Sequence, residues 1–135
     1  MAISKYILKK SRRQAAVKIV STDANTINIT YADVKYADQT IPNATAGNLF
    51  WPITDILYDV PAPASIVRGG NLVFSMSAGQ ESLSFTRDLG VALDEQAHAN
   101  VTINTGAGNS SIIVVFTKGE GFNDPNRQIL EDRDR

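Results

Sequence analysis

The residue types that could support catalysis or metal binding are few and scattered in this sequence. His98 is the single histidine, and Asp94 and Glu95 are the carboxylates that lie near it along the chain. A zinc or iron site normally takes two or more nitrogen or sulfur ligands, and an acid–base pair needs an oriented partner. The chain has no cysteine, which excludes disulfides, thiolate zinc sites and cysteine nucleophiles. The lone histidine therefore predicts neither a metal centre nor a catalytic residue.

Two further patterns associated with enzymes are incomplete. The stretch GAGNSS at 106–111 is rich in glycine, but it lacks the Gly-Lys-Ser/Thr ending of a phosphate-binding loop. No Gly-X-Ser-X-Gly motif of a serine hydrolase is present. We therefore interpret 106–111 as a hairpin loop, and we expect a protein that is not an enzyme and has no cofactor.

Charge is balanced overall but concentrated near the N-terminus. The chain has 13 Lys and Arg against 14 Asp and Glu, a net charge of −1, so it has no general attraction for nucleic acid or anionic membranes. Five cations lie within the first thirteen residues: Lys5, Lys9, Lys10, Arg12 and Arg13. They could form an arm that contacts an acidic protein surface or phosphates. Alternatively they form the solvated side of a first strand whose Ile3, Tyr6 and Leu8 pack inward.

The N-terminal stretch MAISKYILKK lacks the apolar region of a signal peptide, and no segment reaches the roughly 18 apolar residues of a membrane span. We expect a product made in the cytosol that contacts no membrane. The aromatic platforms typical of single-strand binders are also missing, so nucleic acid is not an expected partner.

Apolar and polar residues alternate with a period of two along most of the chain, which is typical of half-buried β-strands. Strands are predicted at 15–20, 26–31, 49–60, 65–68, 71–76, 81–88, 100–105 and 111–118. The last of these, SIIVVFTK, is apolar on both faces and is expected at the centre of a sheet. Only 88–99 could hold a helical turn. Asp23 to Asn25 is expected to form a hairpin turn between the first two of these strands.

The segment IVRGGNLVF at 66–74 contains a Gly-Gly pair between two alternating runs. Gly69 and Gly70 can supply the positive φ that a two-residue type I′ or II′ turn requires, so the flanking strands should pair antiparallel. Arg68 directly precedes this turn. We expect its guanidinium to be solvated at the hairpin end.

Seven or eight short strands separated by turn signals, with almost no helix, predict an all-β fold: an antiparallel β-sandwich or jelly-roll-like domain. A length of 135 residues is typical of one domain. We expect a single domain over 1–135 with extended terminal arms, namely a basic arm at about 1–13 and a C-terminal tail at about 120–135.

Four phrases of the sequence occur in an order that resembles a known group of proteins: ISKYILKKSRRQAAVKIV, FWPI, SIVRGGNLVFSMSAG and SSIIVVFTKGEGF. They resemble small virion structural proteins of tailed bacteriophages, especially marine phages and cyanophages. The resemblance implies a protein of the virion, assembled in the host cytoplasm, present in many copies and bound to the major capsid protein lattice as a decoration or cement protein. It also implies a homo-oligomer, with a trimer favoured.

Two other functions stay open from the sequence. The protein could belong to the neck, tail or baseplate of the virion, or it could be a carbohydrate- or receptor-binding β-sandwich. The last would require exposed aromatic side chains, and Tyr6, Tyr31 and Tyr36 are the candidates. For any protein partner, we expect contacts from the basic segment, the hairpin end and the C-terminal tail: Lys9, Lys10, Arg12, Arg13, Arg68, Phe122, Arg127, Ile129 and Leu130.

Overall fold

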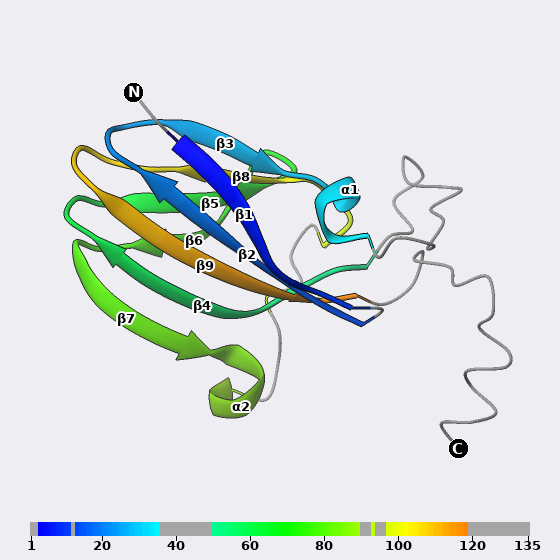
Figure 1. The fold of residues 1–135 in the computed structure, drawn as a ribbon. Helices are drawn as coiled ribbons and strands as arrows, with labels where there is room; N and C mark the ends of the chain where they lie inside the picture. The colour runs from blue at the N-terminus through cyan, green and yellow to red at the C-terminus, as the bar shows by residue number, and fades with distance from the viewer. Residues whose placement is uncertain (1–2, 12, 36–49, 90–92, 94–96, 119–135) are drawn as a thin grey trace, which may run out of the picture.

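A computed structural model of the chain shows two antiparallel β-sheets packed face to face (Figure 1). The residues it describes are 3–11, 13–35, 50–89, 93 and 97–118. Within them the protein is a β-sandwich, which confirms the fold class predicted from the sequence. No helix among these residues is long and apolar enough to cross a membrane.

Nine strands and two short helices make up the described chain. The strands are β1 (Ile3–Lys10), β2 (Gln14–Ser21), β3 (Thr26–Ile29), β4 (Ile53–Val60), β5 (Ala64–Arg68), β6 (Asn71–Met76), β7 (Gly79–Ser84), β8 (Val101–Asn104) and β9 (Ser110–Thr117). The helices are α1 (Tyr31–Val34) and α2 (Phe85–Leu89). Two strands are shorter than predicted, because a helical turn begins where each was expected to continue. The strand β3 ends before Tyr31, and β7 ends before Phe85.

One sheet has five strands in the order β1-β2-β9-β4-β7, and the other has four in the order β3-β8-β5-β6. The strand β9 is third of five, as its apolar character on both faces predicts. The segment at 23–25 does not close a hairpin, because β2 and β3 belong to different sheets. The loop at 106–109 likewise joins β8 in one sheet to β9 in the other, so it is a connection between sheets rather than the predicted hairpin loop.

The core lies between the two sheets and consists of side chains at alternate strand positions. Ala15, Val17 and Ile19 of β2 are fully buried, as their spacing predicts. The rings of Trp51 and Phe116, both fully buried, lie 5.0 Å apart in this core. The apolar inner faces therefore supply the main driving force for packing the two sheets together.

The hairpin of β5 and β6 has the predicted turn, since Gly69 and Gly70 adopt φ values of 55° and 82°. A register shift in this strand pair places Phe74 opposite Ile66 and Leu72 opposite Val67. The shift turns Leu72 outward, and the side chain is 59% exposed. Strict alternation along the sequence predicted an inward Leu72, so the irregular register reverses that prediction.

The basic N-terminal segment is a strand rather than an arm through residue 10. The strand β1 pairs along its length with β2 and forms one edge of the five-stranded sheet. Tyr6 pairs with the outward-facing Lys18, ahead of a bulge between Ile7 and Lys9. Tyr6 and Leu8 are 52% and 53% exposed, contrary to the inward packing that one interpretation of the sequence required.

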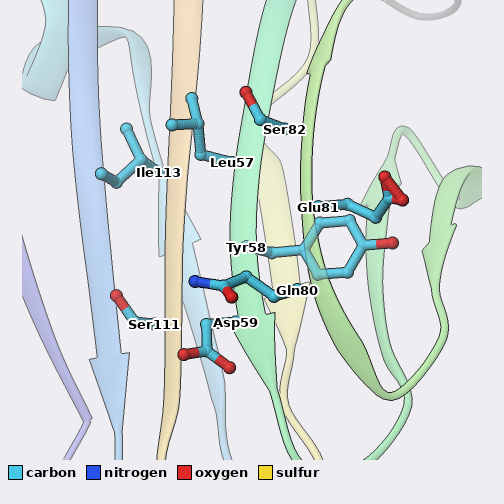
Figure 2. A pocket seen from close by; sticks show the side chains of 8 residues that line it. All are labelled: Leu57, Tyr58, Asp59, Gln80, Glu81, Ser82, Ser111 and Ile113. Atoms are coloured by element: carbon cyan, nitrogen blue, oxygen red, sulfur yellow. The ribbon is translucent and has the colours of Figure 1, made fainter.

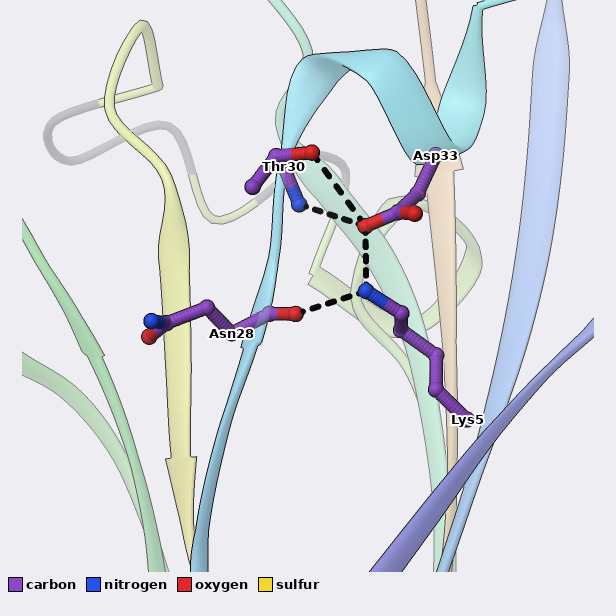
Figure 3. A network of polar contacts seen from close by, with 4 residues as sticks. All are labelled: Lys5, Asn28, Thr30 and Asp33. Carbon is purple, nitrogen blue, oxygen red and sulfur yellow. Dashed lines mark hydrogen bonds and ion pairs between the residues drawn. The ribbon is translucent and has the colours of Figure 1, made fainter.

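Lys5 ties this edge strand to the other sheet (Figure 3). Its Nζ donates hydrogen bonds to the backbone carbonyl of Asn28 at 2.9 Å and to Oδ2 of Asp33 at 2.6 Å. The same carboxylate oxygen accepts a hydrogen bond from the backbone N–H of Thr30 at 2.9 Å, in the capping box that begins α1. This network joins β1, β3 and α1 at one side of the sandwich.

Candidate functional site

The residues that could have formed a catalytic or metal site are not gathered in one. His98 is exposed, and its backbone carbonyl accepts a hydrogen bond from Nε1 of Trp51 at 3.5 Å. Asp94 and Glu95 lie outside the described residues. Across the part of the chain that the structure describes, no three His, Cys, Asp or Glu side chains are grouped in a way that could hold a metal ion.

Arg68 is buried, which corrects the prediction that it contacts a partner at the hairpin end. Its side chain is 0% exposed. Nε donates to the carbonyl of Ala99 at 3.1 Å, Nη1 to that of Trp51 at 3.0 Å, and Nη2 to those of Ala97 and Ala99 at 3.1 and 3.0 Å. The guanidinium carbon lies 4.4 Å from the centre of the Trp51 ring, within reach of a cation–π contact.

This arrangement makes Arg68 a structural residue. Burial lowers the pKa of the Arg68 guanidinium to about 10, so the side chain keeps its charge at neutral pH. The cation is stabilised by three backbone carbonyls and by the face of an aromatic ring. The strand period does contain this signal, because Ala64, Ile66 and Arg68 are alternate residues that share one inward face.

The cations near the N-terminus gather at one end of the sandwich, where the hairpin of β1 and β2 turns. Lys9, Lys10 and Arg13 are exposed there. Lys118, which follows β9, donates a backbone hydrogen bond to the carbonyl of Arg13 and a side-chain bond to that of Val34, each at 2.7 Å. We call Lys9, Lys10, Arg13 and Lys118 the basic end.

The remaining predicted contact residues cannot be placed against this end. Arg12 lies outside the described residues, and so do the C-terminal candidates Phe122, Arg127, Ile129 and Leu130. The last described residue of the chain is Lys118, at the basic end. Of the nine residues predicted to contact a partner, the structure brings together three exposed ones: Lys9, Lys10 and Arg13.

The outward-facing side of the five-stranded sheet is a second candidate surface, which sequence analysis did not identify. We call it the outer face. Neither α1 nor α2 lies over it (Figure 1). The register places one row of outward side chains straight across the sheet, strand by strand: Tyr6, Lys18, Ile113, Leu57 and Ser82. A sheet face that carries exposed apolar side chains is typical of a protein-binding surface.

A groove of about 410 Å³ hollows one half of the outer face, over β9, β4 and β7. Its lining residues are Leu57, Tyr58, Asp59, Gln80, Glu81, Ser82, Ser111 and Ile113. Figure 2 shows that the side chains of Leu57, Ile113 and Asp59 lie on one side of the strands, while those of Tyr58 and Glu81 point the other way. The groove therefore has an aliphatic floor and one carboxylate of its own, from Asp59.

No aromatic ring covers this groove among the residues that line it. The Tyr58 ring is turned toward the core, where it packs edge-on against Phe74 with ring centres 6.4 Å apart. Sugar-binding surfaces usually rely on an exposed aromatic platform. The aliphatic floor and the Asp59 carboxylate are suited to apolar or cationic side chains of a protein.

Charge is divided between the two halves of the outer face. Lys18 of β2 is half-buried. The register places it between Tyr6 of β1 and Ile113 of β9. On the other side of β9, the outward residues of β4 include Asp55 and Asp59. The described outward residues of β1 and β2 include no acid, and those of β4 and β7 include no cation. One half is basic and the other acidic.

No protein-family model and no curated protein matches this chain. Among the solved structures that are similar to it are the following two. KdgF from a Halomonas species matches with a TM-score of 0.40 and 12% identity, over 87% of this chain and 79% of that chain. A cupin superfamily protein from Desulfitobacterium hafniense DCB-2 matches with a TM-score of 0.42 and 14% identity, over 86% of this chain and 77% of that chain. At these identities the likeness concerns the fold alone.

One expectation from the sequence does not stand. We expected a protein that is not an enzyme, because no catalytic motif was found. The lack of a known motif does not exclude catalysis, since one type of fold can carry many unrelated functions.

Proposed function

We propose that this protein is a virion assembly protein of a tailed phage that attaches to the capsid surface through its basic end. The observation that carries the proposal is the gathering of Lys9, Lys10 and Arg13 at one exposed end of a chain whose net charge is only −1. A local cluster of this kind favours binding to an acidic protein surface. The virion context comes from the resemblance of the four sequence phrases to phage structural proteins.

Decoration of a capsid requires many copies, each held by modest contacts. The basic end supplies charge contacts that depend on ionic strength, while the sandwich supplies a rigid body that keeps Lys9 and Lys10 in place. The head is the preferred location because a decoration protein covers an extended lattice. A place in the neck, tail or baseplate is the alternative, and it would use the same end.

The proposal is tested with phage heads that lack the protein. Purified wild-type protein and the Lys10→Glu variant are incubated with such heads, and the bound fraction is measured after sedimentation at low and high salt. Arg87→Glu is the matched control, because Arg87 is also exposed and follows β7 at the other edge of the sheet. Each substitution changes the net charge equally.

We expect Lys10→Glu to weaken attachment about tenfold at low salt, which corresponds to about 1.4 kcal/mol. The difference should shrink at high salt. Arg87→Glu should bind as the wild type does. Equal binding by all three proteins, or no binding of the wild type to heads, would contradict the proposal.

A further inference from the structure

The two halves of the outer face complement each other in shape and in charge. On the half formed by β1 and β2, Tyr6 is 52% exposed and Lys18 is its neighbour in the register. On the half formed by β4 and β7 lies the groove of about 410 Å³, with Leu57 and Ile113 in its floor and Asp59 at its side. A protruding basic half and a hollow acidic half occur on one surface.

We propose that the outer face binds the outer face of a second copy of this chain, in a two-fold dimer whose axis runs along β9. Such an axis exchanges the two halves, so that β2 of one copy faces β4 of the other. Lys18 of each copy then lies over Leu57 of its partner, which is in the same row, and its long side chain extends toward Asp59, two residues further along β4. Tyr6 of each copy enters the groove of its partner near Ser82, because both residues lie in the same row across the sheet.

The direction of the axis follows from the charges. An axis in the plane of the sheet but perpendicular to the strands would place β2 over β2 of the partner, and Lys18 would face Lys18. An axis along the strands instead pairs each basic half with an acidic half, which is favourable at both symmetry-related contacts. Ile113 and Val115 of β9 lie at the centre, where an interface is usually most apolar.

The area is sufficient for a specific contact. The sheet has five strands, most of them eight residues long. With strands about 4.8 Å apart and about 3.3 Å per residue, the flat area of the face is roughly 600 Å². The accessible surface of protruding side chains exceeds the flat area, so each copy approaches the roughly 800 Å² that one partner buries in a standard interface.

The dimer contact does not rest on the proposed function, but it would affect how the protein attaches to a capsid. Because the axis runs along the strands, the ends of β9 next to Lys118 point the same way in both copies. The dimer therefore presents two basic ends on one side, and two linked contacts bind a repeating surface more tightly than one. The trimer favoured by the sequence resemblance is a different assembly and a possible outcome of the test.

The test measures the mass of the full chain in solution, without phage heads, by sedimentation over a wide range of concentration. The wild type should pass from one to two chain masses of 14.6 kDa. Lys18→Glu alone and Asp59→Lys alone should each raise the dimer dissociation constant about a hundredfold. In a two-fold dimer each substitution occurs in both copies, so it places like charges together at two contacts. Circular dichroism checks that each variant is folded.

Rescue distinguishes a contact between copies from an effect within one chain. An equal mixture of Lys18→Glu and Asp59→Lys should form a mixed dimer close to the wild-type affinity, because both pairs are again of opposite charge. A second pair of variants tests the apolar part: Leu57→Asp should abolish the dimer, and Leu72→Asp, on the other sheet, should leave it unchanged.

Four results would overturn the proposal. They are a monomer at every soluble concentration, a trimer, a dimer unaffected by the single reversals, and a mixture that stays monomeric. Each is independent of capsid attachment, which is measured with Lys10→Glu and with heads. A monomer that still decorates heads would remove the dimer and leave the proposed function standing.

Discussion

The guanidinium of Arg68 lies 4.4 Å from the centre of the Trp51 ring and also donates a 3.0 Å hydrogen bond to the Trp51 backbone carbonyl. This one residue thereby joins the end of β5 to the segment that leads into β4 and, through Ala97 and Ala99, to the chain that precedes β8. It donates to carbonyls in the two segments that precede β4 and β8 and so holds both against the end of β5.

Arg68→Met should destabilise the protein by about 3 kcal/mol, since the substitution removes the Arg68 donors from the carbonyls of Trp51 and Ala99 and one of two donors from that of Ala97. Arg68→Lys keeps the charge but loses the planar fork, so it should cost nearly as much. Thermal or urea unfolding measures the loss. A free energy of unfolding within error of the wild type for both variants would show that the buried contacts contribute little.

Asp33 should make stability depend on pH in the acid range. Burial alone would raise the pKa of this carboxyl, but hydrogen bonds from Lys5 and Thr30 and the charge of Lys5 lower it below the usual 3.8. A lowered pKa in the folded state stabilises the protein above the unfolded value, and this contribution is lost as the pH falls below about 4.

Asp33→Asn should therefore cost about 1 kcal/mol at neutral pH. The difference in the free energy of unfolding between the variant and the wild type should narrow as the pH falls below the pKa of a free aspartate carboxyl. Urea unfolding at several pH values measures both curves. If the free energies of unfolding of the two proteins changed with pH in parallel down to the lowest accessible pH, the role assigned to the Lys5–Asp33 ion pair would be contradicted.

Gly70 should tolerate few substitutions, because its φ of 82° is one that side chains with a Cβ rarely adopt. No atom lies within 4 Å of a Cβ built there, so the cost is one of backbone conformation rather than of space. Gly70→Val should lose about 1–2 kcal/mol, whereas Gly70→Asn should lose less. Equal melting temperatures for the two variants would argue against this turn.

Deleting residues 1–10 should lower stability and expose a new sheet edge. The strand β1 covers the edge of β2, and Lys5 links it to Asn28 and Asp33 of the opposite side. Its bulge and lysines are features that discourage unwanted pairing at an edge. We expect a lower melting temperature and aggregation of the shortened chain. An unchanged melting temperature and a soluble monomer would restore the idea of a dispensable arm.

The periodic pattern of the sequence predicts most strands and the class of fold, because a side-chain period of two is a local property. It predicts the inward Val17 and Ile19 of β2 and the central position of β9. It does not predict the pairing that places Tyr6 outward beside Lys18 or the register shift that exposes Leu72. Both depend on pairing between strands, which a single strand does not encode.

The candidate surfaces show the same limit. Sequence analysis identified the basic residues Lys9, Lys10 and Arg13, since they are adjacent along the chain. It assigned Arg68 to solvent because hairpin ends are usually exposed, although the alternation with Ile66 indicates the inner face. The outer face combines Tyr6 and Lys18 of the first hairpin with Asp59 of β4, which is distant in sequence, so only the sheet order reveals it.

The most direct test of the central claim is to image phage heads that lack this protein after adding it in purified form, by electron cryomicroscopy of the sedimented complex. Attachment through the basic end predicts regular density over the shell, with the turn between β1 and β2 against the capsid and Lys10 at the contact. Bare shells, or density only at the portal vertex, would contradict capsid decoration.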